Sequence, residues 1–257
     1  MIFEHNLTPV ALNFFGINIY WYSLSYLFGF IFFIHYSKYL IKKKIFHLEL
    51  RLIDDFLGHA ILGVILGGRL GYVFFYNFDF YLQNPFEIVK IWKGGMSFHG
   101  GLLGVLISMI IFSKNNKFFL ELSNIVSCSA PFGIFLGRIA NFINAELIGR
   151  PTSSNWGILY SDHDYLRHPS QIYSAIFEGL IILIILFFFL HKGFHKKVNV
   201  FSIFLLLYSV SRFIIEFFRQ PDPHLGFVFL NLTLGQILCI PMLFLGIMFL
   251  TYGKKSI

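Results

Sequence analysis

The chain has 257 residues, of which 56% are hydrophobic and only 13% are charged, and its formal net charge is +7. Soluble domains carry about a quarter charged residues, whereas several apolar runs here reach the roughly 20 residues that cross a bilayer. The composition therefore excludes an ordinary soluble domain and predicts an all-α polytopic membrane protein, with residues 1–257 forming one transmembrane domain. Because the lysines and arginines gather in short loops, the positive charge reports membrane topology, and we expect no nucleic-acid partner.

About seven helices are predicted, each on an apolar run that is bounded by charged, glycine or proline residues. Their expected ranges are 17–40, 55–76, 97–113, 119–143, 170–190, 198–218 and 234–252. Two cysteines, Cys128 and Cys239, lie in apolar stretches without a metal-binding motif, so we read them as small buried side chains.

The loops alternate in charge along the chain. One set, after the first, third, fifth and last helices, holds Lys42, Lys43, Lys44, Arg51, Lys114, Lys117, Lys192, Lys196, Lys197, Lys254 and Lys255. The opposite set holds Lys90, Lys93, Arg150, Arg167 and Arg219. Since the more basic loops face the cytoplasm, the N-terminus and residues 77–96, 144–169 and 219–233 are expected outside, and the C-terminus inside.

Glycines recur at spacings of four in the second and third helices, as Gly63, Gly67 and Gly71, and as Gly100 and Gly104. Small residues at this spacing let helices pack closely in lipid, and packing alone explains most of them. Between these helices, the segment NFDFYLQNPFEIVKIWKGG is rich in Phe, Tyr and Trp, which is typical of the membrane interface.

Few charged residues remain inside the predicted helices, and such residues are functional candidates by default because charge is costly in lipid. They are Arg69, Arg138, Glu178, Arg212 and Glu216, with His99, Asn141, Asn144 and Glu146 near a helix end. His99 stands between two glycine pairs near the outer interface, where a substrate could approach the imidazole. It could serve as a general base, or it could be structural.

The stretch GRIANFINAEL, residues 137–147, places Arg138, Asn141 and Asn144 three positions apart, on one stripe of a helix. We expect the helix to break at Glu146, before the Gly149-Arg150-Pro151 turn. A guanidinium fork and two amides match the oxygens of a phosphate group.

The sixth helix carries Tyr208, Arg212 and Glu216 four residues apart, so that they share one face, and Arg219 follows one turn later. Arg212 and Glu216 could simply neutralise each other, or the arginines could form a second cationic row. The segment RHPSQIY, residues 167–173, adds an outward-facing cluster in which Arg167 and His168 could be interfacial anchors. Together these residues predict an outward-facing cationic chamber that suits a phospholipid headgroup.

Five segments in order, LGGRLGYVFFYNF, FHGGL, GRIANFINAELIGRP, RHPSQIY and FIIEFFRQPD, closely resemble the phosphatidylglycerol–prolipoprotein diacylglyceryl transferase family. The resemblance covers nearly the whole chain and implies a seven-helix protein of the bacterial inner membrane with its N-terminus outside. It also implies transfer of diacylglyceryl from phosphatidylglycerol to the lipobox cysteine thiol of a prolipoprotein, with release of glycerol 1-phosphate. No cofactor or metal is implied. The segment 151–166 is shorter than in longer members of the family.

The same resemblance assigns roles to residues of this chain. The expected catalytic residues are His99, Arg138 and Arg212, and the expected substrate-binding residues are Tyr22, Asn141, Asn144, Glu146, Gly149 and Glu216. Tyr208 joins the binding residues because it shares a helix face with Arg212 and Glu216. The chemistry fits these residue types: the arginines would stabilise the charge that grows on the departing phosphate, and the histidine could take the thiol proton or only position the headgroup.

Two other classes of protein would share some of these features. A lipid or anion transporter would also need intramembrane arginines, but it should show repeated halves or broken helices near the midplane, and here the polar groups crowd toward one surface. A non-catalytic membrane scaffold would explain the glycines but not a histidine accompanied by two rows of arginines.

Overall fold

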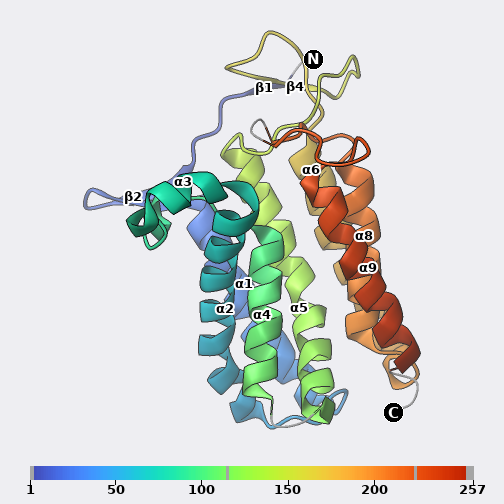
Figure 1. Cartoon of the computed structure of the whole chain (residues 1–257). Coiled ribbons are helices and arrows are strands. Elements are labelled where there is room, and N and C mark those ends of the chain that lie inside the picture. Colours follow the sequence, from blue (N-terminus) through green and yellow to red (C-terminus); the bar gives the residue numbers. More distant parts are fainter. Residues whose placement is uncertain (1–2, 114–115, 223–224, 253–257) are drawn as a thin grey trace. The chain divides into compact units, whose positions relative to one another are not determined.

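The computed structural model is mostly helical and describes residues 3–113, 116–222 and 225–252 (Figure 1). Three lysines used for the topology, Lys114, Lys254 and Lys255, lie outside the described residues. The chain divides into two compact units. Unit 1 comprises Met1–Tyr36 and Val126–Ile257, and unit 2 comprises Ser37–Ile125.

All seven predicted segments contain helix. The observed helices are α1 (Trp21–Lys42), α2 (Leu50–Tyr76), α4 (Phe98–Phe112), α5 (Asn116–Ile143), α6 (Ser170–Ser174) continuing through a π-helical turn (Ala175–Leu180) into α7 (Ile181–His191), α8 (Val200–Ile215) and α9 (Leu234–Tyr252). The boundary between the units falls inside α1 and α5. The first helix begins at Trp21 and not at residue 17, as predicted, because residues 17–20 form a strand.

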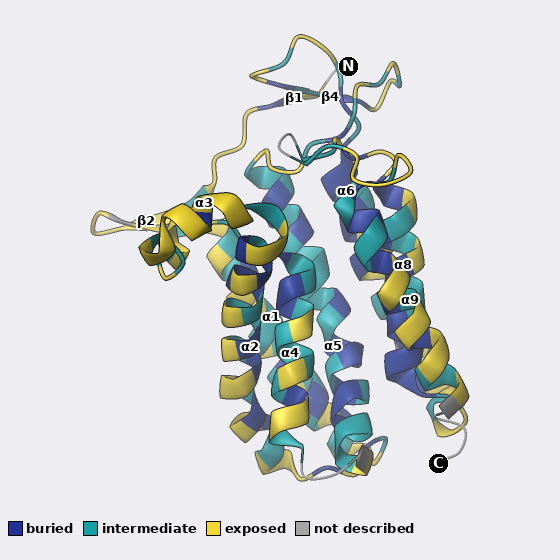
Figure 2. Ribbon diagram, viewed as in Figure 1, coloured by how far each residue is buried: buried dark blue, intermediate teal, exposed yellow. Residues whose placement is uncertain are grey.

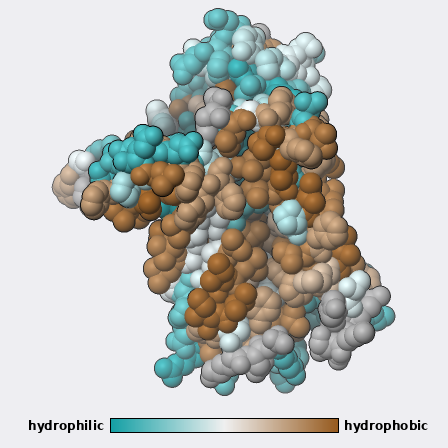
Figure 3. Space-filling model, in the orientation of Figure 1, coloured by the Kyte–Doolittle hydropathy of each residue, from teal (hydrophilic) through white to brown (hydrophobic). Residues whose placement is uncertain are grey.

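Five helical stretches are long and apolar enough to cross a membrane, and Ser170–His191 is among them. Two shorter apolar helices, Phe98–Phe112 and Val200–Ile215, accompany them. Large apolar side chains cover much of the face seen in Figure 3. The exposed apolar side chains of α9 include Phe244, Leu245 and Met248. A polytopic all-α membrane protein is thereby confirmed, and the number of spans stays a prediction.

Short elements lie outside the long helices. The hairpin of β2 (Val10–Phe14) and β3 (Ile17–Tyr20) was not predicted, and its turn is made by Phe15 and Gly16 at positive φ. β1 (Phe3–His5) pairs in parallel with β4 (Ile158–Tyr160), far along the chain.

The aromatic segment after α2 folds into three short helices, α3 (Phe78–Gln83), η1 (Pro85–Glu87) and η2 (Ile91–Lys93). Much of it is exposed (Figure 2), and Phe86 and Trp92 are among its most exposed side chains. Lys90 and Lys93 both bind the Glu87 carboxylate, at 2.6 and 2.7 Å, and these hydrogen bonds lower the pKa of Glu87. Exposed aromatic rings beside paired charges are the pattern expected of an interfacial segment.

In unit 2, α2 and α4 pack together through their glycines. A Cβ atom added at Gly67 or Gly71 would collide with the backbone of Gly100 or Gly104, so no larger residue fits there without a shift. The predicted close packing is confirmed. This glycine packing also holds the N-terminal end of α4, where His99 lies, close to α2.

In unit 1, α8 is the central helix, since it contacts α6, the π-turn, α7 and α9. Its inner face is apolar at Phe204 and Leu205 and then becomes polar toward its C-terminal end. Gly179, on the π-turn, lies against the Phe135 backbone of α5 with no room for a side chain. This close approach brings the neighbouring residue Glu178 toward α5.

Candidate active site

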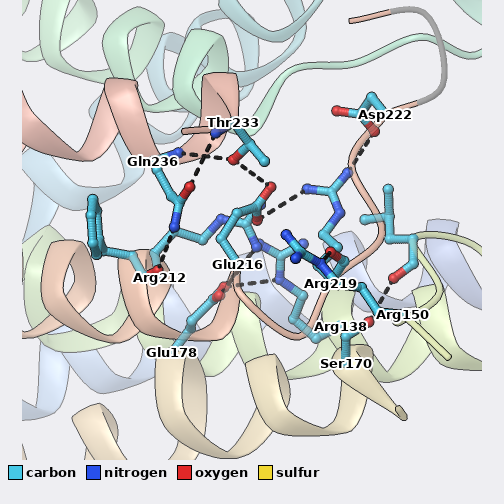
Figure 4. Close-up of polar contacts among 12 residues, drawn as sticks. Arg138, Arg150, Ser170, Glu178, Arg212, Glu216, Arg219, Asp222, Thr233 and Gln236 are labelled. Atoms are coloured by element: carbon cyan, nitrogen blue, oxygen red, sulfur yellow. Dashed lines mark hydrogen bonds and ion pairs between the residues drawn. The ribbon is translucent and has the colours of Figure 1, made fainter. Parts of the chain in front are cut away.

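Glu178 joins two arginines from different helices. It lies in the π-helical turn and is fully buried. Arg138, near the end of α5, donates from Nε and Nη2 to Glu178 Oε2 at 3.1 and 2.8 Å. Arg212 of α8 donates from Nη1 to Glu178 Oε1 at 3.3 Å. Three helical elements are thus held together by one carboxylate (Figure 4).

Glu216, just after α8, continues this set of contacts. It pairs with Arg212 at 2.6 Å and with Arg219 at 3.7 Å, and it accepts a hydrogen bond from the Thr233 hydroxyl at 3.0 Å. Arg219 also pairs with Asp222 at 2.8 Å. We call Arg138, Glu178, Arg212, Glu216 and Arg219 the arginine network; each member is at most 9% exposed.

The network differs from the predicted chamber in its charge. The sequence indicated rows of arginines, whereas the structure opposes each guanidinium with a carboxylate. Of the two alternatives for Arg212 and Glu216, the structure shows the ion pair, at 2.6 Å. Buried charges are tolerated when they are paired, and removing one partner leaves an uncompensated charge. The arginines are therefore held in a buried position by their carboxylate partners.

The remainder of the GRIANFINAEL stretch forms a second polar group. Asn141 and Asn144 donate from Nδ2 to the two carboxylate oxygens of Glu146, at 2.8 and 3.2 Å. The predicted helix break is confirmed: α5 ends at Ile143, Ala145 and Leu147 have positive φ, and the Glu146 amide turns back to the Asn141 carbonyl. The two asparagines and Arg138 thus have different partners.

The loop after this stretch is held by the RHPSQIY segment. Arg167 donates to the Gly149 carbonyl at 2.8 Å, and Gln171 donates to the Glu146 carbonyl at 2.6 Å. Gly149 has no space for a Cβ atom, because the His168 carbonyl lies where it would point. Arg167 and Gln171 are nearly fully buried, so RHPSQIY supports the loop from inside.

Arg150 and His168 complete the contacts of this loop. Arg150 donates from Nε to the Arg219 carbonyl at 2.9 Å, which joins the loop to the end of the arginine network. His168 lies 3.2 Å from the Tyr173 hydroxyl and packs edge-on against Phe218, and burial lowers its pKa.

The remaining predicted site residues lie on α8, α1 and α4. Tyr208 is fully buried on α8, one turn before Arg212. Tyr22 is half-buried at the start of α1, and its ring meets the Tyr26 ring edge-on at 5.3 Å. His99 belongs to unit 2, where it is the second residue of α4 and is half-buried.

Sequence reasoning missed several contributors. Glu178 was recognised as an intramembrane charge but was given no role, since nothing local indicates that it binds Arg138 and Arg212. Thr233 and Gln236, at the start of α9, were not noticed at all. Gln236 accepts from the Thr233 amide at 3.0 Å, and this hydrogen bond orients Thr233 toward Glu216.

Comparison with known proteins gives a consistent answer. Residues 9–252 match the family model described as prolipoprotein diacylglyceryl transferase. Proteins named phosphatidylglycerol--prolipoprotein diacylglyceryl transferase are similar over nearly their whole length: one from Rickettsia bellii (strain OSU 85-389) is 47% identical over 94% of each chain, and one from Rickettsia canadensis is 46% identical over 96% of each. A relative from Wolbachia pipientis subsp. Culex pipiens is 45% identical over 95% of this chain and 94% of its own. The chain therefore belongs to the prolipoprotein diacylglyceryl transferase family and is a membrane-bound transferase of lipoprotein maturation.

Proposed function

We propose that this chain transfers the diacylglyceryl group of phosphatidylglycerol to the thiol of the lipobox cysteine of a prolipoprotein. Family membership supports the reaction class, and the names of the relatives supply phosphatidylglycerol and prolipoprotein as substrates. The observation that carries the proposal for this chain is the arginine network, because it places guanidinium groups of two membrane helices around one buried carboxylate.

The phosphodiester of phosphatidylglycerol would bind at Arg138 and Arg212. In the reaction, the cysteine sulfur bonds to the glyceryl carbon of the diacylglyceryl group while the bond from that carbon to the phosphate oxygen breaks. Glycerol 1-phosphate leaves with the bonding electrons, so negative charge grows on the phosphate. Guanidinium groups fixed in a water-poor site stabilise such charge strongly, since their orientation costs nothing at the moment of reaction.

The substrate-binding residues assigned from the sequence would hold the rest of the headgroup. Asn141, Asn144 and Glu146 already form one hydrogen-bonded group, which suits the hydroxyls of a glycerol headgroup. Tyr22, Gly149, Tyr208 and Glu216 complete the proposed set of binding residues.

His99 would take the proton of the attacking thiol. A thiolate is the reactive form of cysteine, and a free thiol with a pKa of about 8.5 is mostly protonated at neutral pH. The protein supplies no nucleophile of its own in this scheme, which fits the burial of Cys128 and Cys239.

The cellular setting follows from the topology. We place the chain in the bacterial inner membrane, as the resemblance to the family implies. The loop charges support an orientation with the N-terminus and residues 144–169 outside and the C-terminus inside. We treat 1–257 as a single transmembrane domain, because the family match runs from residue 9 to residue 252 and so includes parts of both units.

The test is a transfer assay with the purified protein. It is incubated with phosphatidylglycerol vesicles and a peptide that carries a lipobox cysteine, and the peptide mass is measured. The expected result is a gain of one diacylglyceryl group together with release of glycerol phosphate, and neither in a matched peptide with serine in place of cysteine. An unchanged peptide mass with folded protein would overturn the proposal.

A further inference from the structure

Arg69 of α2 binds main-chain carbonyls in the segment that leads to His99. Arg69 is buried. Its guanidinium donates hydrogen bonds to five carbonyl groups, those of Glu87, Ile88, Lys90, Gly94 and Gly95. The hydrogen bonds to Glu87 and Ile88 measure 2.6 and 2.8 Å. The Tyr81 ring lies under the guanidinium, 5.1 Å away. One side chain thus binds five carbonyl groups from both ends of residues 87–95.

This environment separates Arg69 from the arginines of unit 1. Within the described residues Arg69 makes no ion pair, and the nearby carboxylate of Glu87 is bound by Lys90 and Lys93 instead. An arginine has five N–H donors, and here Nε, Nη1 and Nη2 are all directed to carbonyl oxygens. Arg69 is therefore occupied by the backbone and is a poor candidate for binding phosphate.

The segment held by Arg69 runs directly into α4. Gly94 and Gly95, both at a φ of +78°, turn the chain just before the helix. Gly68, the residue before Arg69 in α2, also holds this segment: its carbonyl accepts a hydrogen bond from the Ser97 amide at 2.9 Å. The Ser97 side chain then caps α4 by accepting from the Gly100 amide at 3.2 Å. His99 lies between the capping residue and the capped amide, on the first turn of α4.

We infer that Arg69 is a positioning residue for the transfer reaction, acting through His99. Gly68 and Arg69 anchor residues 94–97 to α2, and this anchor fixes where the first turn of α4 begins and hence where the imidazole lies. Lysine at position 69 would keep the positive charge but could not bind carbonyl groups along residues 87–95 with a planar fork. The inference rests on the proposed role of His99 and adds a residue that touches neither substrate.

The test is a double-mutant cycle with Arg69→Lys and His99→Gln. Rates are measured at about pH 7.5, where the substrate thiol is mostly protonated and proton acceptance by His99 matters, with enough His99→Gln enzyme for its slow turnover to be followed. A small displacement of a catalytic group costs up to about 100-fold, so Arg69→Lys should lower kcat by about 10- to 100-fold with little change in the KM for phosphatidylglycerol. In the His99→Gln background the same change should cost less than about twofold, because the residue that Arg69 positions is no longer there. If the two residues acted independently, Arg69→Lys would cause the same loss in both backgrounds.

Lys93→Gln is the matched control, since Lys93 lies in the same segment but binds the Glu87 side chain and no carbonyl of residues 94–97; it should leave kcat near that of the unmodified enzyme. Equal losses from Arg69→Lys in both backgrounds would overturn the inference and leave the role of His99 intact. Full activity of His99→Gln alone would instead refute the proposed role of His99, and the inference with it. If Arg69→Lys does not fold, Arg69→Gln replaces it in the cycle, and failure of both to fold would show that Arg69 serves folding alone.

Discussion

Replacing Arg138 by lysine separates charge from geometry at the centre of the arginine network. Arginine reaches Glu178 Oε2 through Nε and Nη2 together, whereas a lysine amine is a single point of contact on a flexible stem. Glu178 keeps Arg212 at 3.3 Å, and the positive charge at position 138 is retained, so no buried carboxylate is left without a counter-charge. We therefore expect the lysine variant to fold and to reach the membrane.

The expected loss of activity follows from the lost contact. A hydrogen bond to a charged group contributes about 1.5–3 kcal/mol, and about 1.36 kcal/mol corresponds to a tenfold change in rate. If the fork holds the phosphate in the transition state, Arg138→Lys should lower kcat/KM by about 10- to 150-fold. Initial rates with phosphatidylglycerol vesicles measure this, and gel filtration in detergent measures the folded fraction.

The matched control is Arg51→Lys, the same change at an exposed arginine that lies 3.7 Å from Asp55. It should leave transfer unaffected. Near-normal activity of Arg138→Lys would show that only a positive charge is needed there and would refute the bidentate role. A loss of folded protein in proportion to the loss of activity would instead make Arg138 a structural residue.

Three further predictions concern other parts of the chain. His99→Gln should lose about 10²–10⁴-fold in rate near neutral pH and recover in part at high pH, whereas a deficit that is constant from about pH 6 to about pH 9.5 would exclude proton transfer by His99. An impermeant thiol reagent applied to intact cells should label Trp156→Cys and miss Lys196→Cys, and the reverse pattern would overturn the proposed orientation. Because burial lowers the pKa of His168, the unfolded state binds its proton more readily, and stability should fall as the pH drops below about 6.5. His168→Gln should therefore lose less thermal stability between pH 7.5 and pH 5.5 than the unmodified protein does, and an equal loss would place the acid sensitivity elsewhere.

The sequence was informative wherever the physical cause is local. Apolar length alone located the helices, and the glycine spacing predicted the packing of α2 on α4, because both depend on residues within a few turns. The end of α5 was predicted for the same reason, since Gly149-Arg150-Pro151 follows closely. The capping of α4 by Ser97 is equally local, although it was not predicted.

Contacts between distant segments were not predictable in this way. Glu178 binds Arg138 because it lies in a π-helical turn and because the next residue, Gly179, has no side chain to keep this turn away from α5. Neither feature can be recognised from a pattern in the sequence. The pairing of β1 with β4 joins residues 3–5 to residues 158–160, and no periodicity indicates the partner. The role of Arg69 was hidden likewise, because its acceptors are carbonyl groups, which every sequence contains.

We propose that the phosphatidylglycerol headgroup binds at the arginine network. The most direct measurement is photolabelling with a phosphatidylglycerol that carries a photoreactive group on its headgroup glycerol, followed by peptide mapping. If the headgroup binds there, label should appear in the peptides that contain Arg138 and Arg212, and it should be suppressed by excess unlabelled phosphatidylglycerol and reduced in Arg138→Lys. Label confined to exposed apolar side chains of α9 such as Phe244 and Met248, and unaffected by competition, would contradict binding at the arginine network.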